Sequence, residues 1–158
     1  MYNKQHSVED RDKCIEMLGG NLDAYNYICK IRFIAHTWDE LVDRDRPISS
    51  QTINTCFWGL LFELHSDPFY LANITFLRPV LMCIASDWIA TQELEYNPKG
   101  ENDMIVSFVL RAGTSMTMSC LLLTGGLQAV YKYGAELLRL SHREKFSDYV
   151  DSIKERRE

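Results

Sequence analysis

Hydrophobic residues repeat along this chain with the spacing of helices and not of strands. In residues 22–43 the apolar positions follow one another in steps of four and three, which places them on one face of a helix. These positions are Ala24, Ile28, Ile31, Ala35, Trp38 and Val42. No stretch shows the sustained alternation of apolar and polar residues that is typical of a half-buried strand. The pattern predicts an all-α fold, a single-domain bundle of six or seven helices over residues 1–158 with a central apolar helix.

Residues that cap helices set the expected boundaries. A helix start is predicted where a Ser, Asn or Asp side chain can accept a hydrogen bond from a free backbone N–H group. These predicted caps are Ser7, Asn21, Ser49 or Ser50, Asp67 with Pro68 behind it, and Ser141. The polar ends of the chain, residues 1–6 and about 150–158, are expected to fray.

Two segments are apolar nearly all round and should be covered by other helices. Pro79 is expected to break or kink its helix, which leaves the central apolar helix over 80–95. A second such helix should run from about Met104 to Thr124 and be interrupted at Gly125–Gly126. Two all-apolar helices exceed what one small core covers, so the sequence predicts a homodimer that buries part of one of them.

Charge and cysteine content narrow the function classes. The 17 Lys and Arg residues against 22 Asp and Glu residues give a net charge of −5, which disfavours nucleic-acid binding because phosphates need a basic face. The five cysteines lack zinc-finger spacing and predict reduced thiols in the cytoplasm. The N-terminus lacks the apolar core of a signal peptide, and the least charged stretch, residues 112–131, is too polar to face lipid. We expect a soluble protein with no membrane partner.

The end of the helix over 22–43 carries an acidic cluster. At about 100° per residue, His36, Asp39, Glu40 and Asp43 fall within one arc beside the apolar stripe. Three neighbouring carboxylates repel one another, and a divalent cation such as Mg²⁺ or Mn²⁺ would relieve that repulsion. The alternative is a solvated acidic helix end, in which Arg32 and His36 supply the opposite charges.

A second acidic group lies on the apolar helix. Asp87, Thr91 and Glu95 are spaced four residues apart and project along one line of the helix. Arg111 is the only charged residue between Met104 and Tyr131 and is expected to be buried. One interpretation is a structural Asp87–Arg111 ion pair; the other is a polar pocket in which Arg111 binds an anionic group of a substrate.

These acidic motifs resemble those of two enzyme families. The run 39–43, together with Asp87, Thr91 and Glu95, resembles the paired metal motifs of class I terpenoid synthases. That resemblance implies two facing acidic helices that hold magnesium ions on a substrate diphosphate, although the chain is too short for the fold of those enzymes. The Glu40-Leu41-Val42-Asp43 piece also looks like half of the motif of all-α nucleotide pyrophosphatases.

A longer resemblance covers about residues 20–130. The segments 36–45, 53–58 and 67–70 are similar to a family of small helical proteins from phages and bacteria, which has no assigned activity. The first of these segments contains the motif His-x-Trp-Asp-x-x-x-Asp-x-Asp. The resemblance implies a phage protein of the host cytoplasm and supplies no mechanism.

Two functional hypotheses follow. In the first, the protein is a metal-dependent enzyme acting on a phosphate- or diphosphate-containing small molecule, with Arg111 on a phosphate oxygen and His36 as general base or partner of a ligand. The metal ligands would be Asp39, Glu40, Asp43, Asp87 and Glu95. In the second, the protein is a non-catalytic helical module that binds a protein partner, and the acidic cluster is structural.

Overall fold

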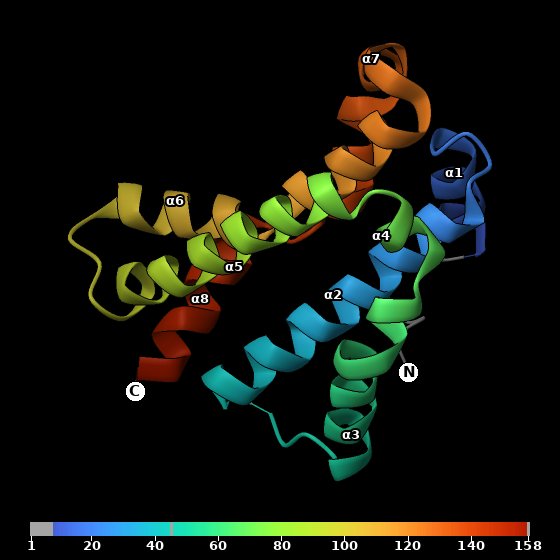
Figure 1. Cartoon of the computed structure of the whole chain (residues 1–158). Coiled ribbons are helices and arrows are strands. Elements are labelled where there is room, and N and C mark those ends of the chain that lie inside the picture. Colours follow the sequence, from blue (N-terminus) through green and yellow to red (C-terminus); the bar gives the residue numbers. More distant parts are fainter. Residues whose placement is uncertain (1–7, 45, 158) are drawn as a thin grey trace.

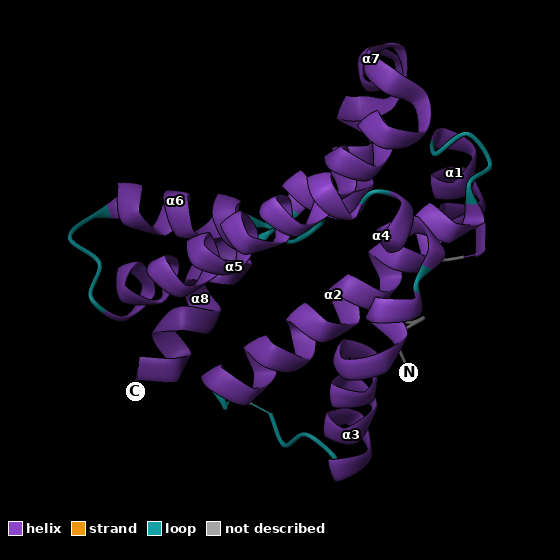
Figure 2. Ribbon diagram, viewed as in Figure 1, coloured by secondary structure: helices purple, strands orange, loops and turns teal. Residues whose placement is uncertain are grey.

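Every regular element of the structure is helical. The computed structural model describes residues 8–44 and 46–157 (Figure 1), and within them Figure 2 shows helices joined by loops, which confirms the predicted all-α fold. The α-helices are α1 (Val8–Met17), α2 (Leu22–Asp43), α3 (Ser50–Trp58), α4 (Pro68–Ala72), α5 (Ile74–Tyr96), α6 (Glu101–Arg111), α7 (Thr114–Ser141) and α8 (Phe146–Arg157). A π-helix, η2 (Gly59–Glu63), and a 3₁₀-helix, η3 (Leu64–Ser66), connect α3 to α4.

Three predicted helix caps are confirmed. The side chains of Asn21, Ser49 and Asp67 each accept a hydrogen bond from the backbone N–H three residues further on, at 2.9–3.0 Å. Pro68 occupies the first position of α4, where its missing N–H costs no helical bond. The predicted cap at Ser7 lies outside the described residues. The first turns of α2, α3 and α4 are therefore fixed by local sequence.

The last helix starts later than predicted. Ser141 is the final residue of α7, and its carbonyl accepts a 2.9 Å hydrogen bond from Arg32 of α2, so it closes one helix instead of opening the next. Helix α8 begins at Phe146 and is polar by composition. Nevertheless its Tyr149 and Ile153 are buried against α6, and these contacts hold the helix on the fold.

Pro79 lies inside α5 without ending it, so of the predicted break or kink the break is wrong. As the sixth residue of the helix, it removes only the bond that its N–H would make to the carbonyl of Thr75. Thr75 and Pro79 both lie on the exposed side of α5, where water can bond to the unpaired carbonyl. Helix α5 therefore extends from Ile74 to Tyr96 as one element.

Glycines interrupt the second apolar segment at two points. Gly126 adopts a non-helical conformation with φ 62°, so the predicted interruption there is confirmed. A break that was not predicted occurs at Gly113, whose left-handed conformation with φ 59° separates α6 from α7. The expected continuous helix over 104–124 is therefore two helices, and its first half presents an exposed face.

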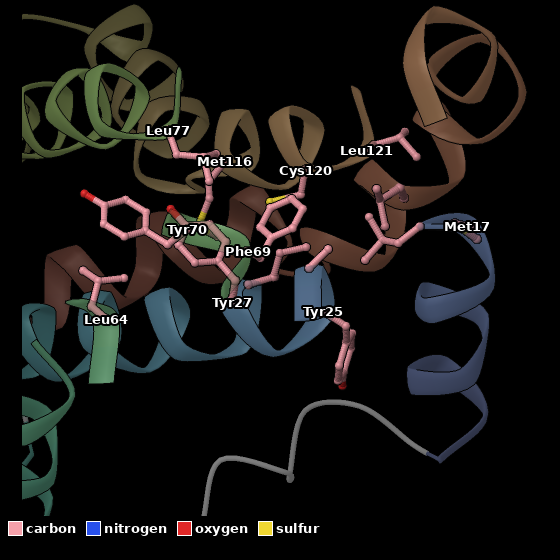
Figure 3. Close-up of a cluster of buried hydrophobic side chains, with 14 residues drawn as sticks. Met17, Tyr25, Tyr27, Leu64, Phe69, Tyr70, Leu77, Met116, Cys120 and Leu121 are labelled. Carbon is pink, nitrogen blue, oxygen red and sulfur yellow. The ribbon is translucent and has the colours of Figure 1, made fainter. Parts of the chain in front are cut away.

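The main core lies where α2 and α7 meet, with α1, α4, η3 and α5 around them (Figure 3). Tyr27 is fully buried there, stacked at 5.9 Å on Tyr70 and 5.7 Å from the ring of Phe69. Cys120 and Leu121 of α7 and Leu77 of α5 are also fully buried. This core joins the first half of the chain to the second and leaves the outer sides of α3 and α5 uncovered.

The apolar helix α5 is only half covered. It packs against α4, α6 and α7, while Met82 and Ile89 on its other side are 62% and 56% exposed. By length and composition α5 is able to cross a membrane, and the bent α6–α7 pair passes the same test as a unit. One such helix is weak evidence for a membrane span; core helices of soluble proteins pass the same test but are mostly buried, whereas 11% of the α5 window is buried. The uncovered side of α5 still requires an explanation.

Candidate functional site

One arginine binds acidic residues of two helices. Arg111 is the last residue of α6, and its side chain is only 9% exposed. Its Nη1 donates to Oε2 of Glu95 on α5 at 2.5 Å. Its Nη2 donates to Oδ1 of Asp39 and, at 3.4 Å, to Oδ2 of Asp43, both on α2. The guanidinium therefore lies between α2 and α5 and binds carboxylates of both. We call these residues and their hydrogen-bonded neighbours the Arg111 network.

An aromatic side chain covers one side of this arginine. The ring of Trp88 on α5 lies 5.1 Å from Cζ of Arg111, a cation–π distance. The indole Nε1 of Trp88 donates to Oδ1 of Asp39 at 3.1 Å. Trp38 on α2 packs on Trp88 with ring centroids 4.3 Å apart. Trp88 thus shields the ion pair from water while it satisfies one of the carboxylate oxygens.

The second oxygen of Glu95 has partners of its own. The Ser107 hydroxyl donates to Glu95 Oε1 at 3.1 Å, and the buried Tyr149 hydroxyl of α8 donates to the same oxygen. The two hydroxyl oxygens are 2.7 Å apart. Glu95 therefore has hydrogen bonds on both oxygens, which is what a buried carboxylate requires.

The electrostatics favour a charged arginine and a neutral tyrosine. Burial opposes the positive charge of Arg111, but Asp39, Glu95 and Asp43 together raise the pKa of its guanidinium above the ordinary value. Burial and the neighbouring Glu95 carboxylate raise the pKa of Tyr149, so its hydroxyl stays protonated and donates. With three carboxylates against one guanidinium, the Arg111 network carries an excess of negative charge.

Helical spacing explains how short stretches of sequence build this network. Asp39 and Asp43 are one turn apart on α2 and project from the same side of that helix. Ser107 and Arg111 are likewise one turn apart on α6, so both side chains project toward Glu95 and bond to it. Two helical repeats therefore supply four members of the network, and Trp88 and Glu95 of α5 and Tyr149 of α8 complete it.

The structure brings together four of the seven predicted site residues. Asp39, Asp43, Glu95 and Arg111 form one bonded group, and the predicted burial of Arg111 with a carboxylate partner is confirmed. The prediction that this partner is Asp87 is wrong. Two steps of four residues rotate the side chain by about 80° around a helix, so Asp87 lies at the edge of the face that carries Glu95. Within the described residues, Arg111 is not bonded to Asp87.

The other two predicted site residues lie apart from the guanidinium. His36 of α2 is exposed, and Glu40 is half-buried. Neither is bonded to Arg111 in the part of the chain described. The expected arc on α2 exists, but only the side with Asp39 and Asp43 faces the network. The predicted role of His36 as general base therefore stays a prediction.

Sequence reasoning missed three members of the network. Trp88 lies on an apolar helix, where a tryptophan is by default a core residue, so nothing in the sequence indicated its contact with Arg111. Ser107 had a usable signal, since it stands four residues before the only charged residue of its segment. Tyr149 had none, because it lies in a terminal helix that appears polar and reaches the site only through tertiary packing.

The Arg111 side chain fills the space between the three carboxylates. A metal ligated by Asp39, Asp43 and Glu95 would need the position that the Arg111 side chain fills. Among the described residues, no group of three or more His, Cys, Asp or Glu side chains is arranged to hold a metal ion. Comparison with protein-family models, curated proteins and solved structures gave no match.

Proposed function

We propose that this protein is a non-catalytic helical module that binds a protein partner, in which the Arg111 network is structural. The observation that carries the proposal is the position of the guanidinium, which is bonded to carboxylates of both α2 and α5. A buried arginine with three carboxylate partners holds helices in place. A substrate phosphate would have to compete with those carboxylates for the same N–H groups.

Exposed aromatic side chains support an interaction role. Phe57, Trp58 and Phe62, at the junction of α3 and η2, are each more than half exposed, as is Leu61. Trp58 and Phe62 pack on each other with ring centroids 4.7 Å apart. Contiguous apolar surface of this kind marks interaction sites in soluble proteins, and aromatic residues are enriched at the centres of protein interfaces.

The cysteines support the cytoplasm as its location. All five are unpaired, and Cys56 and Cys120 are buried. Burial raises the pKa of the Cys120 thiol to about 12, so it remains a neutral thiol packed in the core. Five free thiols in one small chain fit a reducing compartment, such as the cytoplasm of a cell or of a phage host.

The excess of negative charge in the Arg111 network supports a second candidate function. Asp39 is the most accessible of the three carboxylates, with 36% of its side chain exposed against 6% for Asp43 and Glu95. A Mg²⁺- or Mn²⁺-dependent enzyme acting on a phosphate- or diphosphate-containing small molecule would use this excess. In such an enzyme, Arg111 would have to move away from the carboxylates to bind the phosphate. That movement would break its ion pairs with Asp39, Asp43 and Glu95.

Thermal melting in Mg²⁺ separates the two functions. A site with a Kd of about 100 µM would add about 2.7 kcal/mol to the stability at about 10 mM Mg²⁺. We expect no such stabilisation in the wild type, in Asp39→Ala or in the matched control Asp87→Asn, whose carboxylate lies outside the network. A rise in Tm with Mg²⁺ in the wild type and in Asp87→Asn, abolished in Asp39→Ala, would overturn the proposed function.

A further inference from the structure

We propose that the partner is a second copy of this chain, and that two copies pair antiparallel through the outer side of α5 about a two-fold axis near Ser86. The inference rests on the proposed function, because it names the partner of that interaction module. It would also account for the side of α5 that the rest of the chain leaves uncovered.

The outer side of α5 is a continuous uncharged face. The exposed residues between Arg78 and Glu93 are Pro79, Met82, Cys83, Ser86, Ile89 and Ala90. Pro79, Met82, Ser86 and Ile89 follow one another in steps of three and four, which is the spacing of a helix–helix seam. At 1.5 Å per residue the face between the two charges is about 22 Å long. We call it the α5 seam.

The charges at its two ends are opposite in sign. Arg78 lies at one end of the seam and Glu93 at the other, and both are exposed. In the described structure Arg78 has no ion-pair or hydrogen-bond partner. A second α5 laid antiparallel brings Arg78 of each copy beside Glu93 of the other. A parallel arrangement would instead place like charges together, so the charge pattern selects a two-fold antiparallel pair.

The same register matches the apolar side chains. The axis that pairs position 78 with position 93 also pairs Met82 with Ile89 of the second copy, and these are the two most exposed large side chains of the seam. Ser86 lies next to the axis, and its hydroxyl donates to the Met82 carbonyl at 2.8 Å. Burying Ser86 would therefore leave no unsatisfied donor. Cys83 and Ala90 flank the seam as small residues that allow close approach.

A lipid surface is the competing occupant, and the seam fits it less well. Helix α5 as a whole is long and apolar enough to cross a bilayer, but its uncharged outer face between Arg78 and Glu93 covers only residues 79–92. Ser86 also places a polar side chain at the middle of that face. The opposite charges at the two ends complete an antiparallel protein pair.

Charge exchange tests the pairing directly. The mass of the wild type, measured by analytical ultracentrifugation from about 1 to 200 µM, should rise from that of a monomer to that of a dimer. Arg78→Glu and Glu93→Arg should each raise the dimer Kd about tenfold or more, because each change occurs twice in the pair. The double variant Arg78→Glu/Glu93→Arg should restore a Kd within about threefold of the wild type. Both positions are exposed, and circular dichroism confirms that each variant folds.

A cross-link tests the axis. In a Cys83→Ser background, Ser86→Cys should form an intermolecular disulfide under mild oxidation, whereas Ser147→Cys, exposed on α8, should not. A wild-type mass of 18.4 kDa at 200 µM, or a double variant that is no better than the singles, would overturn the proposal. So would a monomer that sediments with vesicles of neutral phospholipid. The Mg²⁺ melting experiment above decides the structural role of the Arg111 network independently of these results.

Discussion

One oxygen of Asp39 accepts hydrogen bonds from the Trp88 indole, at 3.1 Å, and from Arg111. The carboxylate is on α2, the indole on α5 and the guanidinium on α6, so this single oxygen joins three helices. Both donors also touch each other through the cation–π contact. Removing one of these three groups therefore disturbs the pairing of the other two.

Arg111→Met should strongly destabilise the fold. The substitution keeps the approximate length of the side chain but removes the cation that binds Glu95, whose side chain is nearly buried. Removing one partner of a buried pair typically costs about 3–5 kcal/mol. Urea unfolding measures the loss. Arg139→Met, at an exposed position of α7, is the control and should change stability by less than about 0.5 kcal/mol. A loss below about 1 kcal/mol in Arg111→Met would show that the network contributes little.

Two tyrosine-to-phenylalanine substitutions should have opposite effects. The Tyr149 hydroxyl donates to Glu95, and hydrogen bonds to charged groups contribute about 1.5–3 kcal/mol, so Tyr149→Phe should destabilise by that order. The Tyr27 hydroxyl is buried and, within the described residues, has no hydrogen-bond partner. Tyr27→Phe should therefore be neutral or stabilising. Urea unfolding of both variants checks the pair, and equal losses would contradict the assigned bonding.

The stability should fall above pH 10 in a way that depends on Tyr149. Its pKa is raised in the folded protein by burial and Glu95, so unfolding lets the side chain release a proton once the pH exceeds the ordinary value of about 10. The stabilisation is full below that pH and is lost above it, by about 1.4 kcal/mol per pH unit. The wild type should therefore lose more stability between pH 10 and 11 than Tyr149→Phe. Tyr131→Phe, at an exposed position, should follow the wild type.

Two glycine-to-alanine substitutions should differ in sign. Gly113 adopts a left-handed conformation in open space, so alanine there meets no neighbour but is strained by about 1–2 kcal/mol. Gly59 has helical backbone angles and also has no atom within 4 Å of an added Cβ. Gly59→Ala should therefore be neutral or stabilising by about 0.4–1 kcal/mol. Thermal unfolding of both variants decides whether the break at Gly113 is required.

Local signals were sufficient for much of the fold. Helix α2 runs over the predicted residues 22–43. Its two signals, an amphipathic pattern and the Asn21 cap, both depend only on residues close together in the sequence. The break at Gly113 was not predicted, since one glycine in an apolar helix is tolerated as often as it ends one. Pro79 was expected to act more strongly than it does, because its exposed position in α5 is set by tertiary packing.

The candidate site was predictable only in part, for a similar reason. A buried arginine in an apolar segment needs a carboxylate partner, and this requirement identified Arg111 as a site residue. Which carboxylate binds Arg111 depends on how α5 is oriented about its own axis. Glu95 and Asp87 project about 80° apart around that axis. Tyr149 completes the site from a helix whose own sequence shows no preference for burial. Contacts between distant segments carry no local signal.

The separation of its members along the chain also determines when the Arg111 network can form during folding. Asp39 and Tyr149 are 110 residues apart in the sequence, and closing the chain between them costs entropy that only a largely assembled bundle offsets. We therefore expect the α5–α6 hairpin to bring Glu95 and Arg111 together before α2 and α8 reach them. A network that forms after the folding transition state stabilises only the native state. Breaking it should therefore accelerate unfolding and leave the refolding rate nearly unchanged.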